Sequence, residues 1–356
     1  MNRLIGIGLM SGTSLDGLDI SATEFTFEKE KVLFKIINSK TFQYNDLLGK
    51  RLADSMILSG LELMRLHHDF GKYCGEKVND FLKEFRINPD FIASHGHTVF
   101  HQPENGFTTQ IGCGATLSAE TGITTICDFR SLDVALGGQG APLVPIGDEI
   151  LFADYDACLN IGGIANISFK RNGQRIAFDI CGANMVLNYL CEKIEKKMDE
   201  GGLIAKSGNI QAVLLQNLNM NPYFQIKEKK SLGKEWVSEN ILRKIEVANA
   251  SVNDKLRTVT EHIANKIAEV ILSNKLKRVL VTGGGAHNQF LIERIKSLTK
   301  EEIILPEKQI IDFKEAVIFS LLGALRLRNE TNVLNSVTGS KIDSCSGSVY
   351  FGIKNQ

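Results

Sequence analysis

The sequence predicts a two-domain α/β protein, and three observations support this prediction. Its 356 residues are enough for two domains of ordinary size and for at least one large core. Short apolar runs of strand length alternate with longer segments whose apolar residues recur every three or four positions, as in an amphipathic helix. A strand, glycine turn, strand pattern also occurs twice, at residues 4–22 and 157–169, which indicates an internal duplication.

Composition and charge exclude several classes of protein. Lys and Arg total 41 and Asp and Glu total 41, so the chain lacks the basic excess of proteins that coat nucleic acid. Apolar residues make up 43% and charged residues 23%, which is typical of a soluble globular protein and not of a disordered one. The longest candidate membrane segment, residues 316–325, has about half of the length that a spanning helix needs. We therefore expect a small neutral or acidic ligand, with no nucleic acid and no membrane as partner.

The cysteines indicate the compartment. There are seven, widely scattered and never spaced as Cys-x-x-Cys. This pattern favours neither a disulfide framework nor a zinc knuckle, so reduced thiols are the economical interpretation. We therefore expect a cytoplasmic protein.

The predicted elements follow in order from the hydrophobic spacing. Strands are expected at residues 4–10, 18–22, 91–93, 157–161, 164–169, 175–178 and 278–281. Helices are expected at residues 61–85, 185–197, 253–274, 289–298 and 314–328. The apolar stripe of the helix at 253–274 is assigned to the core and to no chemistry.

Three glycine turns separate these elements. The turns at residues 11–17 and 162–163 each join two strands, whereas the turn at residues 282–285 joins a strand to a helix. Backbone N–H groups and a helix N-terminus at such a loop can face a phosphate or a ribose. The three turns together predict a nucleotide-binding cleft.

The turn at residues 11–17 has the composition of a phosphate site. It holds two glycines, three hydroxyl side chains and Asp16. Its backbone donors suit phosphate oxygens, and the Asp16 carboxylate suits a magnesium ion held through water. The same composition is common in ordinary turns, and that alternative stays open.

Asp179 is the candidate carboxylate for phosphoryl transfer. It follows the predicted strand at 175–178 and precedes a predicted turn and a helix start. Phosphoryl transfer depends mostly on positioning and charge neutralisation, with one carboxylate near the acceptor. The alternative is that Asp179 caps the following helix.

Two further segments are candidates for a substrate pocket. His95 and His97 follow a predicted strand and share a face, so they are interpreted as a polar pocket wall; the alternative, a metal site, has no third ligand at a suggestive spacing. Arg130 precedes the glycine-rich residues 137–142, and its guanidinium suits a carboxylate. A surface ion pair with Asp128 or Asp133 is the alternative for Arg130.

Taken together, these motifs resemble the anhydro-N-acetylmuramic acid kinases of bacterial cell-wall recycling. The most specific are Gly-Leu-Met-Ser-Gly-Thr-Ser-Leu-Asp-Gly at residues 8–17 and Gly-Gly-Gln-Gly-Ala-Pro at residues 137–142. The resemblance spans nearly the whole chain in order. Its other segments are residues 95–99, 128–130, 143–145, 160–166, 178–179, 230–235, 282–288, 315–316 and 337–339.

The resemblance implies a fold and a reaction. The fold would be the actin-like ATPase or sugar kinase fold, with two ribonuclease H-like α/β domains around a nucleotide cleft. Water would open the 1,6-anhydro ring of the sugar while the γ-phosphoryl group of ATP passes to O6. The products would be N-acetylmuramic acid 6-phosphate and ADP, with Mg²⁺ as the metal. A homodimer is also implied.

The resemblance further implies roles for individual residues. Asp179 would be the general base on the attacking water. The ATP phosphates would be held by Gly12, Thr13, Ser14, Leu15, Asp16, Gly17, Leu18 and Asp19, and by Gly162 and Gly163. The adenosine side would be held by Gly283, Gly284 and Gly285. The sugar would meet His97, Thr98, Arg130, Gly138, Gln139, Ala141 and Pro142. Asn184, Lys230 and Glu315 match motif positions without an assigned role.

The sequence departs from the family pattern after the catalytic aspartate. Family members usually continue with Thr-Gly-Pro-Gly-Asn, whereas this chain has Ile-Cys-Gly-Ala-Asn at residues 180–184. Asn188 stands where a further Asp is usual, and His97 stands where Gln is common. Because Asp179 and Asn184 are retained, we expect activity to survive. The altered loop after Asp179 is where a change of rate or substrate range would arise.

Two alternatives to this function remain at the level of sequence. One is a kinase for another sugar, or a plain ATPase, on the same scaffold. The other is a non-catalytic, actin-like nucleotide-binding protein, which would need no second, sugar-shaped pocket. The expected domains are residues 1–128 with 334–356, carrying the first phosphate hairpin, and residues 129–333, carrying Asp179, the second phosphate turn and the adenosine loop.

Overall fold

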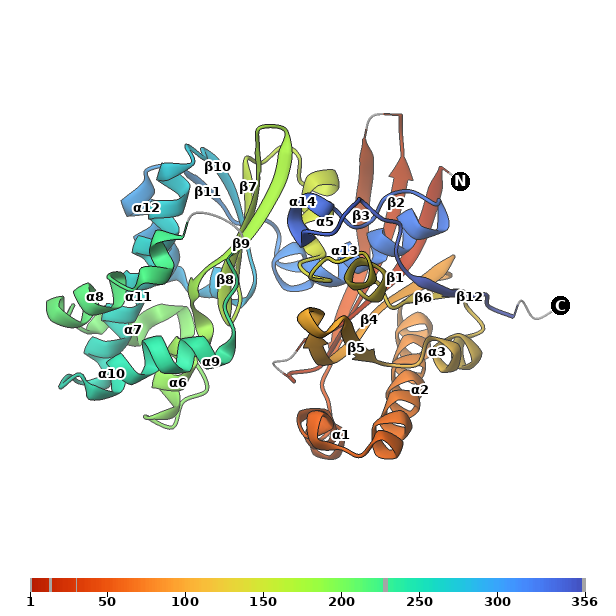
Figure 1. The fold of residues 1–356 in the computed structure, drawn as a ribbon, viewed down its shortest axis with the longest axis horizontal. Helices are drawn as coiled ribbons and strands as arrows, with labels where there is room; N and C mark the ends of the chain where they lie inside the picture. Colours follow the sequence, from red (N-terminus) through yellow and green to blue (C-terminus); the bar gives the residue numbers. More distant parts are fainter. Residues whose placement is uncertain (1, 13–14, 30, 227–229, 354–356) are drawn as a thin grey trace. The chain divides into compact units, whose positions relative to one another are not determined.

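The computed structural model describes residues 2–12, 15–29, 31–226 and 230–353, and they form a mixed α/β protein (Figure 1). The chain divides into two compact units, residues 1–152 with 313–356 as unit 1 and residues 153–312 as unit 2. The expected domains instead grouped residues 129–152 and 313–333 with the second domain. No helix in the described residues combines the length and the hydropathy needed to cross a bilayer.

Unit 1 is built on one large sheet. Its strands are β1 (Arg3–Ser11), β2 (Leu18–Phe27), β3 (Val32–Phe42), β4 (Phe91–Gln102), β5 (Phe107–Ile111), β6 (Thr125–Cys127) and β12 (Ser348–Tyr350). Their order is β12-β6-β4-β1-β2-β3, and β5 pairs with β4. The helices are α1 (Asp46–Ala53), α2 (Gly60–Phe85), α3 (Gly114–Thr121), α4 (Ser131–Ala135), α5 (Val144–Leu151), α13 (Lys308–Leu327) and α14 (Asn335–Thr338). The boundary between the units at residues 312 and 313 therefore falls inside α13.

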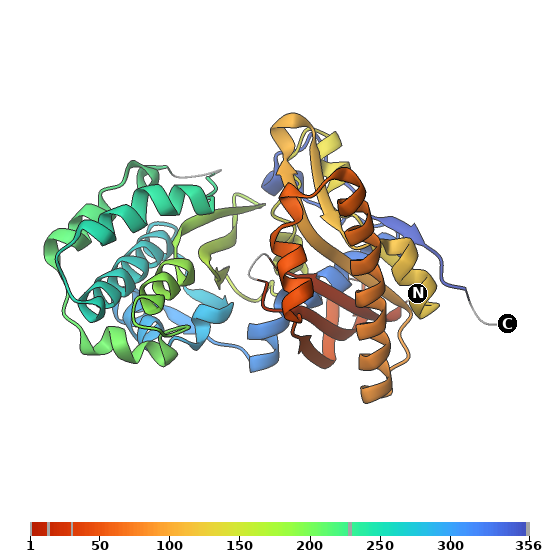
Figure 2. The same ribbon diagram turned by 90° about the horizontal axis from the view of Figure 1, so that it is seen from below.

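The alternation of side chains along the strands gives unit 1 a core on each face of its sheet. On β1, Ile7 and Leu9 join the core that includes α1, α2 and α3, whereas Leu4 joins the core that includes α5 and α13. Figure 2 shows α1 and α2 against the strands. The long helix α2 begins with a capping box between Ser59 and Glu62, which agrees with the predicted helix at 61–85.

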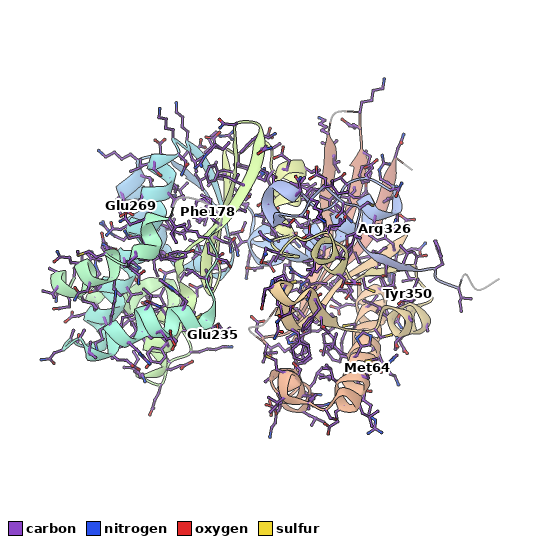
Figure 3. The ribbon with its side chains drawn as sticks, viewed as in Figure 1. Met64, Phe178, Glu235, Glu269, Arg326 and Tyr350 are labelled. Carbon is purple, nitrogen blue, oxygen red and sulfur yellow. The ribbon has the colours of Figure 1, made fainter. Side chains whose placement is uncertain are left out.

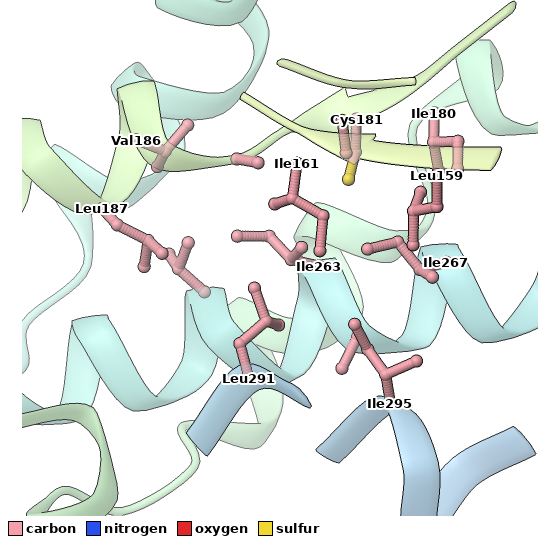
Figure 4. Packing of buried hydrophobic residues seen from close by; sticks show 14 of the residues in the cluster. Leu159, Ile161, Ile180, Cys181, Val186, Leu187, Ile263, Ile267, Leu291 and Ile295 are labelled. Carbon is pink, nitrogen blue, oxygen red and sulfur yellow. The ribbon is translucent and has the colours of Figure 1, made fainter. Parts of the chain in front are cut away.

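Unit 2 has a five-stranded sheet. Its strands are β7 (Ala157–Ile161), β8 (Ile164–Arg171), β9 (Gln174–Gly182), β10 (Arg278–Thr282) and β11 (Glu302–Ile304), in the order β11-β10-β7-β8-β9. The helices are α6 (Asn184–Glu192), α7 (Leu203–Ser207), α8 (Ala212–Asn219), α9 (Lys234–Val237), α10 (Arg243–Val247), α11 (Val252–Ser273) and α12 (Gln289–Thr299). Figure 4 shows the core of this unit, where Ile263 and Ile267 of α11 pack near Leu159 and Ile161 of β7 and near Leu291 and Ile295 of α12.

The two sheets share one strand order. In each unit the first three strands form an antiparallel meander. On the other side of the first strand lie two parallel strands, β4 and then β6 in unit 1, and β10 and then β11 in unit 2. Thus β6-β4-β1-β2-β3 in unit 1 corresponds to β11-β10-β7-β8-β9 in unit 2. This is the arrangement expected of paired ribonuclease H-like domains, so the predicted fold class is confirmed. The shared order also agrees with the duplication inferred from the repeated glycine turn.

Candidate active site

Asp179 lies inside β9, because the strand continues to Gly182. The expectation that the strand ends at residue 178 is therefore wrong. Asn166 of β8 pairs with Asp179 and Ala165 pairs with Cys181, which leaves Ile180 as the extra residue of a β-bulge. A bulge bends a strand and redirects its side chains while the flanking pairs persist. The bulged Ile180 and the next residue, Cys181, are both buried and hold this end of the strand in the core.

The Asp179 carboxylate is held through one of its two oxygens. Oδ2 accepts hydrogen bonds from the Leu232 amide at 2.8 Å and from the Ser231 hydroxyl at 3.2 Å. Oδ1 has no hydrogen-bond partner among the described residues. The Tyr223 hydroxyl donates to the Asp179 backbone carbonyl at 2.7 Å and fixes the main chain there.

The helix-cap alternative for Asp179 does not fit this geometry. Ala183 occupies the N-cap position of α6, and no side chain caps that helix. The Asp179 carboxylate accepts instead from the loop at residues 231–232.

Burial sets the electrostatics around Asp179. It raises the pKa of the Asp179 carboxyl above its ordinary value, and the hydrogen bonds from Leu232 and Ser231 and the charge of Lys230 act in the opposite direction. Lys230 is itself buried, and this lowers its pKa. Its ammonium group lies 4.6 Å from the ring centre of Tyr223 and 5.4 Å from that of Phe178, which Figure 3 labels.

The predicted second phosphate turn is fastened to the start of α6. The Gly163 carbonyl accepts from the Ala183 amide at 2.8 Å and from the Met185 amide at 3.2 Å. The Gly162 carbonyl accepts from the Asn184 amide at 3.1 Å, and the Asn184 side chain donates to the Ile161 carbonyl at 3.1 Å. Asn184 therefore has a visible structural role: it locks the turn to the helix that follows the Asp179 strand.

The predicted adenosine loop meets this turn within unit 2. Gly283 follows β10 with φ of 82°, a backbone conformation that residues other than glycine rarely adopt. A Cβ atom there would overlap the Asn160 side chain and the Ile161 carbonyl, so the glycine allows the loop to lie against the end of β7. Gly284 and Gly285 continue as a 3₁₀ turn, Gly284–His287. The structure thus brings both predicted nucleotide segments of unit 2 to one place.

The first phosphate hairpin lies between β1 and β2 in unit 1. Thr13 and Ser14 lie outside the described residues. The Leu15 amide donates to the Gly12 carbonyl at 3.4 Å, and Leu15 has φ of 60°. The Asp19 carboxylate accepts from the Thr41 hydroxyl at 2.5 Å. Asp16 is exposed, Gly17 is buried, and Leu18 belongs to the core rather than to an open surface.

His97 is joined to this hairpin. It pairs with Ser11 across the parallel strands β1 and β4, and its Nδ1 lies 2.9 Å from the Ser11 hydroxyl. Because the Tyr44 hydroxyl donates to Ser11 at 2.7 Å, the Ser11 proton is free to be donated to His97. Burial lowers the pKa of His97 to about 4, so the ring is neutral near pH 7. Thr98, the next residue, is half-buried and accepts from the Gln110 amide group at 3.4 Å.

Arg130 is held by neutral acceptors. Its Nη1 donates to the Gly140 carbonyl at 2.6 Å, and its Nε and Nη2 lie 3.1 and 2.9 Å from Nε2 of His95. His95 Nδ1 is 2.9 Å from the Gly96 carbonyl, which can only accept, so Nδ1 carries the proton and Nε2 accepts from Arg130. Burial lowers the pKa of Arg130 to about 10, which leaves it a cation at neutral pH.

The surface ion pair considered for Arg130 is absent from the described residues. Asp128 accepts from the Ser131 hydroxyl at 2.6 Å, and Asp133 accepts from the Gly140 amide at 2.7 Å. Glu315 of α13 interacts electrostatically with Arg130, and burial raises the pKa of the Glu315 carboxyl. The charge of Arg130 is therefore kept without a directly bonded carboxylate.

The rest of the predicted sugar segment forms the loop after α4. Gly138 and Gly140 are buried, Ala141 is half-buried, and Gln139 and Pro142 are exposed. The Gln139 amide donates to the backbone carbonyl of Thr338 at 2.9 Å, which ties the loop to the C-terminal segment.

A histidine metal site is not supported. Both ring nitrogens of His95 are used in the contacts described above, and His97 Nδ1 is used by Ser11. Across the residues that the structure describes, no three His, Cys, Asp or Glu side chains are grouped to hold a metal ion.

Several contributors were not among the predicted site residues. Tyr44 and Tyr223 act by holding other residues, and nothing in their local sequence marks that role. Ser231 and Leu232 hold Asp179 and lie in the family-like segment at residues 230–235, which was a signal for them. His95 and Asp133 were noted for other reasons, as a pocket-wall residue and as an ion-pair partner. Ser11 belongs to the predicted phosphate turn without a role of its own, and Thr338 lies in a family-like segment that was given no function.

Comparison with known proteins gives one consistent family. A sequence model for anhydro-N-acetylmuramic acid kinase matches residues 4–352. The anhydro-N-acetylmuramic acid kinase of Mannheimia succiniciproducens is 35% identical over 97% of this chain and 98% of its own length. That of Vibrio cholerae is 35% identical over 98% of this chain and 99% of its own length.

Solved structures are more distant in sequence. The activator of the 2-hydroxyisocaproyl-CoA dehydratase from Clostridium difficile is 12% identical, with a TM-score of 0.44 over 91% of this chain and 97% of its own. The ROK hexokinase from Thermus thermophilus is 9% identical, with a TM-score of 0.40 over 90% of this chain and 99% of its own. The family match is the decisive result, since it extends over nearly the whole sequence. The chain belongs to the anhydro-N-acetylmuramic acid kinase family.

Proposed function

We propose that Asp179 is the general base that opens the anhydro ring of the substrate. By its family, the chain is an ATP-dependent anhydro-N-acetylmuramic acid kinase of peptidoglycan recycling. The observation that carries the proposal is the held carboxylate. Leu232 and Ser231 fix one oxygen of Asp179, and the other has no partner among the described residues. Burial raises the pKa of the Asp179 carboxyl, which makes its ionised form a stronger base than an exposed aspartate.

The reaction balances with one aspartate. Asp179 takes a proton from water as the water oxygen forms a bond to C1 of the sugar. The bond from C1 to O6 breaks and leaves its electron pair on O6. O6 then attacks the γ-phosphorus of ATP, and ADP leaves with the electrons of the bridging bond. The products are N-acetylmuramic acid 6-phosphate and ADP.

We assign the ATP contacts to the three glycine segments. Gly12 to Asp19 and the pair Gly162 and Gly163 would bind the phosphates, and Gly283 to Gly285 would bind the adenosine side. The proximity of the two unit 2 segments at Ile161 supports their shared role. Asp16, exposed in the hairpin, suits a magnesium ion held through water, because Mg²⁺ keeps several waters and binds through few carboxylates. That ion would neutralise phosphate charge.

We assign sugar binding to unit 1 segments around Arg130. A half-buried arginine whose guanidinium has no directly bonded carboxylate suits the lactyl carboxylate of the sugar. His97 and Thr98 on β4, with Gly138, Gln139, Ala141 and Pro142, would surround the rest of the molecule. Glu315 and Lys230 would act through the charges of Arg130 and Asp179, with which they interact.

The test is a phosphate-transfer assay with purified protein. ATP is supplied with 1,6-anhydro-N-acetylmuramic acid, with ordinary hexoses, or with no sugar, and the products are identified by mass spectrometry. Transfer to the anhydro sugar alone is expected. Transfer to another sugar, or ATP binding with no transfer, would support the two alternatives instead.

We also propose a cytoplasmic homodimer. The free state of all seven cysteines supports a reducing compartment, and the family resemblance supports the dimer. Light scattering after gel filtration tests the second point, since a dimer has twice the 39.3 kDa mass of the chain.

A further inference from the structure

The guanidinium of Arg130 has unused hydrogen-bonding capacity. Arginine has five N–H donors. In Arg130, Nε and Nη2 each make one contact to His95, and Nη1 makes one to Gly140. Both acceptors are neutral, so they fix the plane of the guanidinium without cancelling its charge. Whatever holds these two acceptors in place also decides where the remaining donors point.

Gly140 is held by a buried carboxylate. Asp133 is fully buried, and its Oδ2 accepts from the Gly140 amide at 2.7 Å. The backbone carbonyl of Asp133 accepts from the Gly138 amide at 2.9 Å, so the same residue fastens the loop at two points. Asp133 therefore holds the amide of Gly140, and the carbonyl of the same residue accepts from Arg130.

Thr338 completes the contacts of that carboxylate. Its hydroxyl donates to Asp133 Oδ1 at 2.7 Å, and its backbone carbonyl accepts from the Gln139 amide at 2.9 Å. Thr338 is buried and ends α14, 205 positions from Asp133 in the sequence. A buried carboxylate is costly unless its oxygens are hydrogen-bonded, so the hydroxyl of Thr338 supports the orientation of Asp133.

We propose that Thr338 and Asp133 are positioning residues that aim the Arg130 guanidinium at the carboxylate of the sugar, acting through the Gly140 carbonyl. The proposal rests on the sugar-binding role proposed for Arg130. Neither residue touches the sugar in this scheme. Their loss lets the loop at residues 138–140 shift, and Arg130 then meets the substrate with poor geometry.

Two substitutions at one position isolate the hydroxyl. Thr338→Val keeps the shape of the side chain and removes the donor, whereas Thr338→Ser keeps the donor. We expect Thr338→Val to raise the KM for the anhydro sugar about 5- to 10-fold with an unchanged KM for ATP. We expect Thr338→Ser to keep the KM for the anhydro sugar within about 2-fold of the wild-type value.

A matched control separates this effect from general loss of stability. Thr23 is fully buried in β2 of the same unit, with its hydroxyl 3.2 Å from that of Ser21. Thr23→Val should lower the melting temperature and leave the KM for the sugar unchanged. If Thr338→Val does not give folded protein, Thr338→Ala removes the same donor without adding bulk, and the same KM comparison applies.

A double-mutant cycle with Arg130→Ala decides whether Thr338 acts through Arg130. The expected result is that Thr338→Val has no further effect on the KM for the sugar once Arg130 is removed. An equal effect in both backgrounds would overturn the proposal, as would an unchanged KM for the folded Thr338→Val protein when Arg130→Ala raises it. If Arg130→Ala itself leaves the KM for the sugar unchanged, the sugar-binding role of Arg130 fails, and the positioning role fails with it.

Discussion

At the scale of single residues, burial shifts the pKa values of the titratable groups in both proposed sites: two histidines near the sugar site, and Asp179. It lowers the pKa of His97 to about 4, and it lowers that of His95 well below its ordinary value, so both rings are neutral. A neutral His95 can accept from Arg130, whereas a protonated one would repel it. Burial acts on Asp179 in the opposite direction and raises its pKa. For the two histidines the shift favours the neutral ring that the contacts require, whereas for Asp179 it makes the ionised carboxylate a stronger base.

The role of Asp179 is tested by Asp179→Asn. The amide keeps the shape and still accepts from the Leu232 amide, but it cannot take a proton from water. General-base assistance is typically worth about 10²- to 10⁴-fold, so kcat should fall by at least that factor while the affinities for ATP and sugar change little. Steady-state kinetics and ligand titration measure both quantities. A rate within a few-fold of wild type would remove Asp179 from the mechanism.

The pH dependence gives a second prediction about the same residue. A base works only when deprotonated, so kcat/KM should fall as pH decreases through the pKa of Asp179, which lies above the ordinary aspartate value. The Ser231 hydroxyl lowers that pKa, and Ser231→Ala should therefore move the acid limb to higher pH. Ser273→Ala, an exposed serine of α11 that bonds to the Val270 carbonyl, is the control and should not move it. An unmoved limb in Ser231→Ala would contradict the assignment.

At the scale of elements, local spacing predicted the long helices well and the strand ends poorly. The helix expected at 253–274 is α11, Val252–Ser273, because its buried face and its Ser251 cap are both local signals. The strand expected at 175–178 continues to Gly182, since pairing with β8 overrides the polar Asp179. β3 has no buried residue and alternates only between half-buried and exposed positions, and it was not predicted.

The adenosine loop gives a prediction at this scale. Gly283→Ala places a side chain at φ of 82° and against Asn160 and Ile161, so unit 2 should lose stability and bind ADP more weakly. Gly173→Ala is matched in φ, at 81°, but has open space around it. Positive φ strains the backbone in both variants, whereas the overlap, and the ψ of 166° outside the left-handed helical region, act at Gly283. Calorimetry of unfolding and of ADP binding compares them; equal effects of the two variants would count against a packed loop.

At the scale of the whole molecule, contacts between distant segments are the part that local patterns could not reveal. Thr338 and Asp133 meet across 205 positions, and no spacing rule connects them. Residues 129–152 lie in unit 1, where Leu143 and Ile146 join the core that includes α13, and the expected domain boundaries did not anticipate this. The family was predictable because its motifs extend over nearly the whole chain, and the comparisons confirm it. The roles of the individual site residues stay predictions.

The proposed sugar and nucleotide sites lie on different segments of the chain, and hydrogen exchange can test this division. Ligand binding protects amides from hydrogen exchange where it suppresses local opening. The anhydro sugar alone should slow exchange in peptides covering residues 95–98 and 138–142, whereas ADP with Mg²⁺ should slow it in peptides covering residues 162–163 and 283–285. Arg130→Ala should weaken the first pattern and leave the second intact, because it removes the proposed partner of the sugar carboxylate and no nucleotide contact. Exchange measured by mass spectrometry at saturating ADP and at several sugar concentrations provides the comparison. If the sugar protects only the glycine segments of unit 2, or if Arg130→Ala abolishes protection by ADP, the assignment of sugar and nucleotide to these segments is wrong.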